Sequence, residues 1–270
     1  MSGIYLDYNA TTPVDPRVAD AIEPWLHRQF GNLSSQHAAG QAARKAVKQA
    51  RIQVARLIGA DPEEIVFTGG GSEASNQAIK GSVVFQPRRF LARLFSGRSA
   101  ETAHIITSVI EHPATREPLE FLRRLGASVT IVPVDRAGMV DPDDVRGAIT
   151  PRTRLVTIMH SNNEVGTLLP IREIACICQE RGIGMHTDCA QSLGKVPVDV
   201  RELGVDLMTI AGHKLYAPKG VGVLFIRRGL TLEPLIHGAG HEQGRRAGTE
   251  NVPYLVGLGV AADLARKALP

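Results

Sequence analysis

Short runs of β-branched and other apolar residues recur along the chain, and longer segments with helical periodicity separate most of them. Most of the runs show no polar alternation, as expected for strands that are covered on both faces. They are EIVF at 64–67, HIIT at 104–107, SVTIVPV at 128–134, RLVTIM at 154–159, GIGMHT at 182–187, DLMTI at 206–210 and GVLFI at 222–226. Strands of this kind form a mostly parallel sheet between helices, so the sequence predicts an α/β fold, a three-layer α/β/α sandwich.

Two of the separating segments carry clear helical signals. GQAARKAVKQARIQVARLIGA at 40–60 has apolar residues at helical spacing, and IREIACICQERG at 171–182 ends near a glycine that can cap a helix. A third segment, 85–101, is basic and apolar at once. It is either an amphipathic segment that touches a membrane or a partner, or a surface helix or loop with solvated arginines.

Length and composition limit the class of protein. The 270 residues suffice for one large α/β domain, and no run approaches the roughly 20 apolar residues of a membrane span. The start MSGIYLDYNATT lacks the features of a secretion signal, which predicts a cytoplasmic protein. Cys176, Cys178 and Cys189 are too few and too close together for a disulfide framework, so we expect free thiols. A net charge of +4 without a stripe of basic and aromatic residues argues against binding to nucleic acid.

The first chemical motif is a glycine-rich turn between a predicted strand and a predicted helix, FTGGGSEASNQAIKG at 67–81. Such a turn frees backbone N–H groups to bind a phosphate, assisted by the helix N-terminus. It has neither the G-x-G-x-x-G spacing nor the Gly-Lys-Ser/Thr of a nucleotide-binding loop, so it favours a single phosphate. The alternative is a purely structural turn with Ser72 as the helix N-cap.

Asp188 stands at the carboxyl end of a predicted buried strand, in HTDCAQS at 186–192. A buried acid is costly unless it pairs with a cation or accepts strong hydrogen bonds, so Asp188 is a candidate site residue. Alternatively, its carboxylate caps the next turn.

Two further strand ends supply polar groups to the same edge of the sheet, where open α/β sheets bind ligands. MHSNNEVG at 159–166 contributes His160, Asn162, Asn163 and Glu164, which are otherwise ordinary turn residues. SVIEHPATREP places His112 at a strand-to-helix junction, where a lone histidine is more often structural than functional.

Lys214 follows the apolar run DLMTI and lies next to His213, in AGHKLYAPKG at 211–220. An exposed loop lysine is the alternative interpretation. Together, however, a phosphate-binding turn, a buried aspartate, an asparagine, a histidine that can stack and this lysine are the parts that hold pyridoxal phosphate. Lys214 would form a Schiff base with the cofactor, and Asp188 would keep its pyridine nitrogen protonated so that the ring accepts electrons.

The same motifs resemble a known family over essentially the whole chain. They are YLDYNATTPVDP (5–16), FGNLSSQHAAGQAAR (30–44), FTGGGSEASNQAIKG (67–81), IEHPA (110–114), IMHSNNEVG (158–166), HTDCAQSLGKVPVD (186–199), GHKLYAPKGVG (212–222) and HGAGHEQGRRAGTEN (237–251). In this order they look like the cysteine desulfurases, which have the class V aminotransferase fold and depend on pyridoxal 5'-phosphate.

The resemblance implies the large domain of a fold type I enzyme and a homodimer that takes sulfur from L-cysteine and leaves alanine. The sulfur would pass as a persulfide to an acceptor or scaffold protein of iron–sulfur cluster assembly or tRNA thiolation. By position, Lys214 and His112 would be catalytic, with His112 stacked on the cofactor ring. The other implied contacts are Asp188 to the pyridine nitrogen, Asn163 and Gln191 to the ring hydroxyl, Gly71, Ser72 and His213 to the phosphate, and Thr249 to the phosphate of the neighbouring subunit.

The resemblance also implies a division of the chain and three departures from the family. Residues 1–14 would be an N-terminal arm, 15–258 the cofactor-binding domain and 259–270 the start of a connecting helix. Ala211 stands where relatives usually carry a phosphate-binding serine, and Leu33 stands where they carry proline. The family's persulfide-forming cysteine and substrate-binding arginine belong to a C-terminal domain that this sequence does not contain.

Cys189, next to Asp188, is a poor substitute for the family's cysteine, because a nucleophile that carries sulfur must be accessible. Three functions therefore stay open. The chain is a cysteine desulfurase that needs its missing domain, a truncated non-catalytic cofactor-binding or scaffold protein, or another enzyme of the same fold such as a selenocysteine lyase or an aminotransferase.

Overall fold

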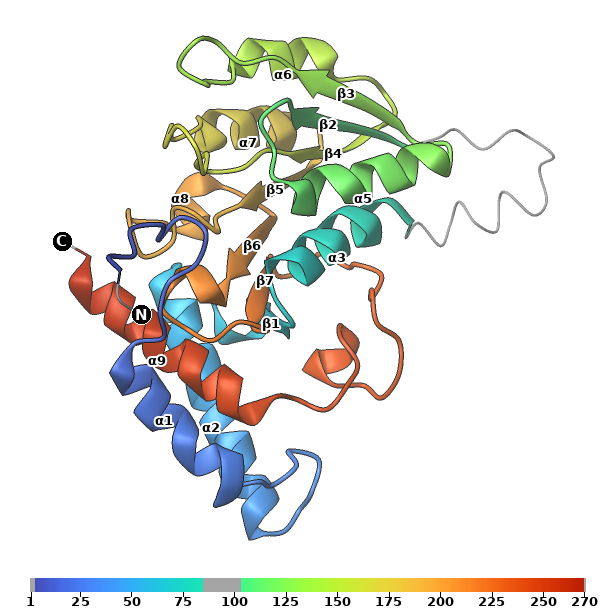
Figure 1. Ribbon diagram of the computed structural model, residues 1–270. Helices are drawn as coiled ribbons and strands as arrows, with labels where there is room; N and C mark the ends of the chain where they lie inside the picture. Colours follow the sequence, from blue (N-terminus) through green and yellow to red (C-terminus); the bar gives the residue numbers. More distant parts are fainter. Residues whose placement is uncertain (1–2, 85–102, 270) are drawn as a thin grey trace, which may run out of the picture.

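The computed structural model describes residues 3–84 and 103–269, and the basic segment 85–101 lies outside this part of the chain. Within the described residues, seven strands form one sheet in the order β1-β7-β6-β5-β4-β2-β3 (Figure 1). They are β1 Ile65–Thr68, β2 His104–Ser108, β3 Ser128–Val132, β4 Thr153–Thr157, β5 Gly184–Asp188, β6 Leu207–Ala211 and β7 Gly222–Ile226. Each strand overlaps one of the apolar runs, with ends shifted by at most two residues, so the predicted strands are confirmed.

The sheet is mostly parallel, as predicted. Strand β7 runs antiparallel to both of its neighbours, β1 and β6, whereas β3, β2, β4, β5 and β6 are parallel to one another. The register pairs Thr157 with His186, and Asp188 with Thr209. The carboxyl ends of β4, β5 and β6 therefore open on one edge of the sheet.

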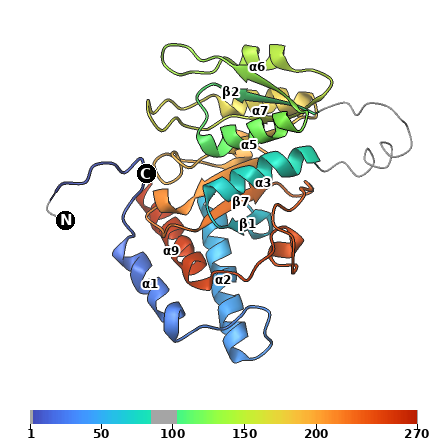
Figure 2. The same ribbon diagram turned by 45° about the vertical axis from the view of Figure 1, so that its right-hand side comes forward.

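Helices cover both faces of the sheet (Figures 1 and 2). They are α1 Pro16–His27, α2 Ala38–Leu57, α3 Gly71–Val84, α5 Pro113–Arg124, α6 Pro142–Ala148, α7 Ile171–Glu180, α8 Val200–Leu203 and α9 Val252–Ala268, with short 3-10 helices η1 Pro62–Glu64, η2 Gly212–Lys214 and η3 Glu242–Gly244. Successive residues of β6 point to opposite faces, since Leu207 packs in a cluster with residues of α3 and α5, and Met208 in one with residues of α2, α7 and α9. The three-layer sandwich is thus confirmed.

The predicted helices at 40–60 and 171–182 correspond to α2 and α7. Val47, Ala50 and Val54 of α2 are buried, which is the apolar stripe expected from their spacing. Helix α7 ends just before Gly182, whose φ of 64° is the left-handed conformation that terminates a helix. No helix in the described part of the chain is long and apolar enough to cross a membrane.

Residues 11–15 are hydrogen-bonded to the turn that contains Lys214. Thr12 donates from both its N–H and its Oγ1 to the His213 carbonyl oxygen at 2.9 Å, and Thr12 Oγ1 accepts from Tyr216 N at 2.9 Å. The predicted boundary between residues 14 and 15 stays a prediction. So does the one between 258 and 259, which falls inside α9.

The loop between β7 and α9 is held by two arginine–carboxylate pairs. Arg51 of α2 binds Glu242 with two hydrogen bonds of 2.8 and 2.6 Å, and Glu242 also accepts from Phe67 N. Arg246 binds Glu73 in the first turn of α3 at 2.9 Å. Bidentate pairs of this kind fix orientation, so the loop has a defined place beside the glycine-rich turn.

Candidate active site

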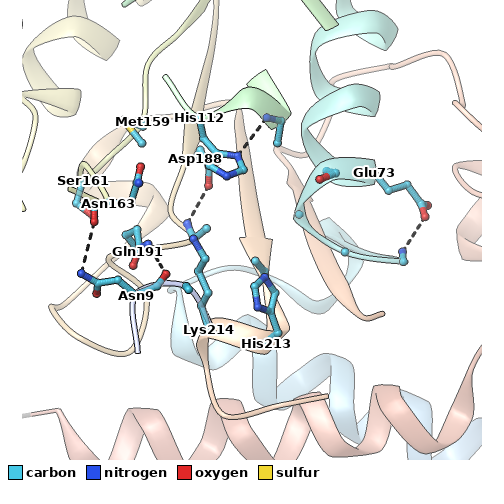
Figure 3. A pocket seen from close by; sticks show the side chains of 18 of the residues that line it. Asn9, Glu73, His112, Met159, Ser161, Asn163, Asp188, Gln191, His213 and Lys214 are labelled. Carbon is cyan, nitrogen blue, oxygen red and sulfur yellow. Dashed lines mark hydrogen bonds between the residues drawn. The ribbon is translucent and has the colours of Figure 1, made fainter. Parts of the chain in front are cut away.

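A cavity of about 630 Å³ lies at the carboxyl edge of the parallel strands, in the size range of sites for small ligands (Figure 3). Of the nine predicted site residues, eight line it: Gly71, Ser72, His112, Asn163, Asp188, Gln191, His213 and Lys214. Segments far apart in the sequence thus meet in one place. Eight of the predicted site residues therefore lie close together in the folded chain.

The glycine-rich turn joins β1 to α3 and forms one wall of the cavity. Gly70 has a φ of 147°, and a side chain at Gly222 would come within 2.6 Å of the Gly70 backbone. The turn therefore packs against β7 with no space for a side chain at Gly222. Helix α3 begins at Gly71, so Ser72 lies in its first turn and lines the cavity. This arrangement suits an anion at the helix N-terminus.

Asp188 ends β5 and is 6% exposed. Its Oδ1 accepts a hydrogen bond from Ala190 N at 2.9 Å, so the turn-capping interpretation is correct, and the side chain also lines the cavity. Burial raises the pKa of this carboxyl group, while the Ala190 N–H and the charges of His112 and Lys214 oppose the shift. A cationic group of a ligand would be stabilised beside it.

His112 is the N-cap of α5, and its Nδ1 accepts from Ala114 N at 3.1 Å. A backbone N–H can only donate, so the neutral ring carries its proton on Nε2. Burial lowers the pKa of His112, which favours this neutral form. The structural role at helix entry is therefore real, and it fixes the orientation of a ring that also lines the cavity.

Lys214 lies in η2, directly after β6, and is half-buried. Burial lowers the pKa of its ammonium group, and the nearby Asp188 charge raises it. A lysine with a lowered pKa has more of the free amine that attacks a carbonyl group. Its neighbour His213 contacts Thr11 Oγ1 through Nδ1 at 3.1 Å.

Of the four polar residues predicted after β4, only Asn163 lines the cavity. The Asn162 Oδ1 accepts from Glu164 N and Val165 N, so Asn162 has the alternative role of an ordinary turn residue. His160 is buried outside the cavity lining, and Glu164 is exposed.

Two predictions concern residues away from the cavity. Thr249 is exposed on the loop between β7 and α9 and does not line the cavity, so its contact to a neighbouring subunit stays a prediction. The three cysteines are free thiols, as expected. Cys189 is buried, and burial raises the pKa of its thiol, which makes it a poor nucleophile.

Several residues of the site were not predicted from the sequence. Asp7, Asn9 and Ala10 of the N-terminal segment form one wall of the cavity, and Lys195 contacts Asn9 of that wall and Gln191. Asp7, Asn9 and Ala10 belong to the motif YLDYNATTPVDP. That motif was recognised by its resemblance to a family, and its residues showed no chemical pattern that predicted a site. Glu111, next to His112, is buried and was also missed.

Comparison with known proteins identifies the family. Residues 4–269 match the family model described as Aminotransferase class-V. The chain belongs to the class-V aminotransferase family. The family resemblance seen in the motifs is thereby confirmed.

Similar proteins of this family are cysteine desulfurases. Cysteine desulfurase IscS of Dictyoglomus turgidum is 49% identical over 97% of this chain, and a cysteine desulfurase of Trichormus azollae is 48% identical over 98%. A solved structure, "SspA in complex with cysteine", has a TM-score of 0.89 and 42% identity, covering 97% of this chain and 72% of that one. These likenesses confirm the predicted fold type I architecture. The chain spans 64% and 63% of the lengths of the two curated relatives.

Proposed function

We propose that the chain is the cofactor-binding part of a pyridoxal phosphate-dependent cysteine desulfurase. The observation that carries this proposal is the meeting of Lys214, Asp188 and His112 in one cavity with the glycine-rich turn. Its substrate would be L-cysteine, whose sulfur is removed to leave alanine. The sulfur would pass as a persulfide to an acceptor or scaffold protein for iron–sulfur clusters or tRNA thiolation.

The cavity fits pyridoxal phosphate at each of its polar ends. The turn at Gly71 and Ser72, together with His213, would hold the phosphate. Asp188, a buried carboxylate with one oxygen bonded to Ala190 N, would pair with the protonated pyridine nitrogen. Asn163 and Gln191 would meet the ring hydroxyl, and His112 would stack on the ring.

When bound, the cofactor supplies an electron sink for bond breaking in the amino acid substrate. The chain's own residues supply attachment, orientation and proton control. Lys214 Nζ offers the amine for covalent attachment, because burial lowers its pKa. His112 carries its proton on Nε2, so this edge of the ring can donate a hydrogen bond.

We further propose a homodimer in which Thr249 reaches the cofactor phosphate of the partner subunit. The ion pairs Arg51–Glu242 and Arg246–Glu73 support this proposal, because they fix a loop that leaves Thr249 exposed. A cytoplasmic location stays a prediction.

The non-catalytic alternative has support from one observation. Cys178 and Cys189 are buried, burial raises the pKa of Cys178 to about 12, and that of Cys189 is raised as well. Neither of these two thiols is suited to carry sulfur to a partner, and the third cysteine, the exposed Cys176 of α7, does not line the cavity. A protein that binds the cofactor without releasing sulfur is therefore the second candidate.

The test compares the purified chain with Lys214→Ala, by visible absorption with added pyridoxal phosphate and then by alanine and sulfide formation from L-cysteine. We expect a cofactor band that depends on Lys214. A Lys214-dependent band without products is the result expected of the cofactor-binding part alone, whereas products above those of Lys214→Ala would overturn the non-catalytic alternative. The absence of any such band contradicts the cofactor assignment.

A further inference from the structure

A second lysine contacts the residues that line the cavity. Lys195 Nζ donates to Gln191 Oε1 at 2.7 Å and to Asn9 Oδ1 at 3.4 Å. Gln191 and Asn9 both line the cavity, whereas Lys195 does not. Figure 3 shows Asn9 below Gln191 and Asn163, on the opposite side of the view from Glu73.

The contacts of Lys195 decide which atoms Gln191 presents to a ligand. An ammonium group can only donate, so the amide oxygen of Gln191 must face it. The amide nitrogen then donates one hydrogen to the Asn9 carbonyl oxygen at 2.9 Å. A flipped amide would place NH₂ against the ammonium group and oxygen against the carbonyl. The polar group that Gln191 has left for the cavity is its second N–H.

The same contacts order the wall of the cavity. Asn9 Nδ2 donates to the Asn163 carbonyl oxygen at 3.4 Å, so Lys195, Gln191, Asn9 and Asn163 form one connected network. Networks of this kind hold each member in one orientation. The network joins the N-terminal segment to the turns that follow β4 and β5.

We propose that Lys195 is a positioning residue for the cofactor, which holds Gln191 as a hydrogen-bond donor to an acidic oxygen of the ligand. This inference rests on the proposed function, in which that oxygen is the ring hydroxyl of pyridoxal phosphate. The Lys195 ammonium group also adds positive charge on this side of the cavity. Both effects favour the ionised form of the ligand oxygen.

The charge of Lys195 acts among other titratable groups. Those that line the cavity are Asp7, Glu73, His112, Asp188, His213 and Lys214. Burial and the charge of Lys214 lower the pKa of Lys195. The charge of Lys214 therefore acts on Lys195, and replacing Lys195 removes one positive charge while leaving those six groups in place.

The experiment titrates pyridoxal phosphate into the wild-type chain, Lys195→Met, Lys195→Arg and Gln191→Glu, with Lys48→Met as the control. Lys48 is exposed on α2 and does not line the cavity. The readouts are the dissociation constant and the pH midpoint of the Lys214-dependent absorption band. Gln191→Glu keeps an oxygen for Lys195 but has no N–H for the ligand.

We expect Lys195→Met and Gln191→Glu to weaken cofactor binding about tenfold, the equivalent of one charge-assisted hydrogen bond at a partly exposed site. Lys195→Met should also raise the pH midpoint of the band, because the lost positive charge favoured the deprotonated ligand. Lys195→Arg should restore both values toward those of the wild type.

Wild-type values for Lys195→Met, or equal losses in Lys195→Met and Lys195→Arg, would overturn the positioning role while leaving the proposed function intact. A wild-type chain without a Lys214-dependent band would overturn both, so the two failures can be told apart. Lys48→Met should match the wild type in every readout.

Discussion

At the scale of single residues, Glu111 is a buried acid next to His112, outside the cavity lining. Its Oε1 accepts from Ser108 Oγ at 2.6 Å and from Met159 N at 3.0 Å, which ties the turn before His112 to the end of β4. Its Oε2 is buried without a partner among the described residues. Burial raises the pKa of Glu111 from 4.5 to about 8, so the group is a neutral acid at pH 7.

This shift predicts a pH-dependent stability. Between pH 4.5 and about 8 the unfolded chain has released the Glu111 proton and the folded chain still holds it. The contribution of Glu111 to the free energy of unfolding is therefore full below pH 4.5 and falls as pH rises toward 8. Glu111→Gln keeps a neutral group and should remove this part of the slope in urea unfolding measured from pH 5 to 9. Parallel slopes for the two proteins would show that Glu111 is ionised in the fold.

Ala211 is the second residue with a testable consequence. It lines the cavity beside the glycine-rich turn, and a β-carbon added at Gly71 would lie 3.2 Å from the Ala211 Cβ. A hydroxyl group at this position would face the glycine-rich turn, where we propose that the phosphate binds. We expect Ala211→Ser to bind pyridoxal phosphate about ten- to hundredfold more tightly, because a hydrogen bond to a charged group contributes about 1.5–3 kcal/mol. Equal or weaker binding in equilibrium titrations would place the phosphate elsewhere.

At the scale of elements, the N-terminal segment and the lysine turn act as one unit. Thr12 is buried, and its hydroxyl group both donates to the His213 carbonyl oxygen and accepts from Tyr216 N. Tyr216 has a φ of 59°, a conformation that non-glycine residues keep only when neighbours hold them there. Thr12 is such a neighbour of the turn that carries Lys214.

Replacing Thr12 by valine preserves the shape of the side chain and removes its hydroxyl group. We expect a loss of about 1–3 kcal/mol in the free energy of unfolding, because the Tyr216 N–H is left without its partner. Chemical denaturation should show this loss for Thr12→Val and a much smaller one for Thr12→Ser, which keeps the hydroxyl. Equal stability of Thr12→Val and the wild type would mean that the turn keeps its conformation without the hydrogen bonds of the Thr12 hydroxyl group.

The elements themselves were largely predictable, for a physical reason. A strand buried on both faces must be apolar throughout, so runs such as DLMTI and GVLFI identify β6 and β7 directly. The direction in which a strand runs leaves no comparable pattern in the sequence. The antiparallel orientation of β7 and the order of the strands depend on how the whole chain packs, and the apolar runs could not supply them.

At the scale of the whole molecule, the site joins residues that are far apart in the sequence. Asn9 and Gln191 are in hydrogen-bond contact across 182 positions. Strand-end motifs predicted the residues that carry obvious chemistry, because carboxyl ends of parallel strands meet at one edge. Asn9 and Lys195 were missed because their contacts with each other, with Gln191 and with Asn163 leave no pattern in the local sequence. Thr249 stays a prediction because the structure holds one chain.

The central claim is that Lys214 is the residue that binds pyridoxal phosphate covalently. The most direct measurement incubates the chain with the cofactor, reduces it with borohydride and locates the pyridoxyl group by peptide mass spectrometry. We expect the modification on Lys214, with none on Lys219, the neighbouring exposed lysine. Modification spread over surface lysines, or its persistence at other positions in Lys214→Ala at the wild-type level, would contradict the account.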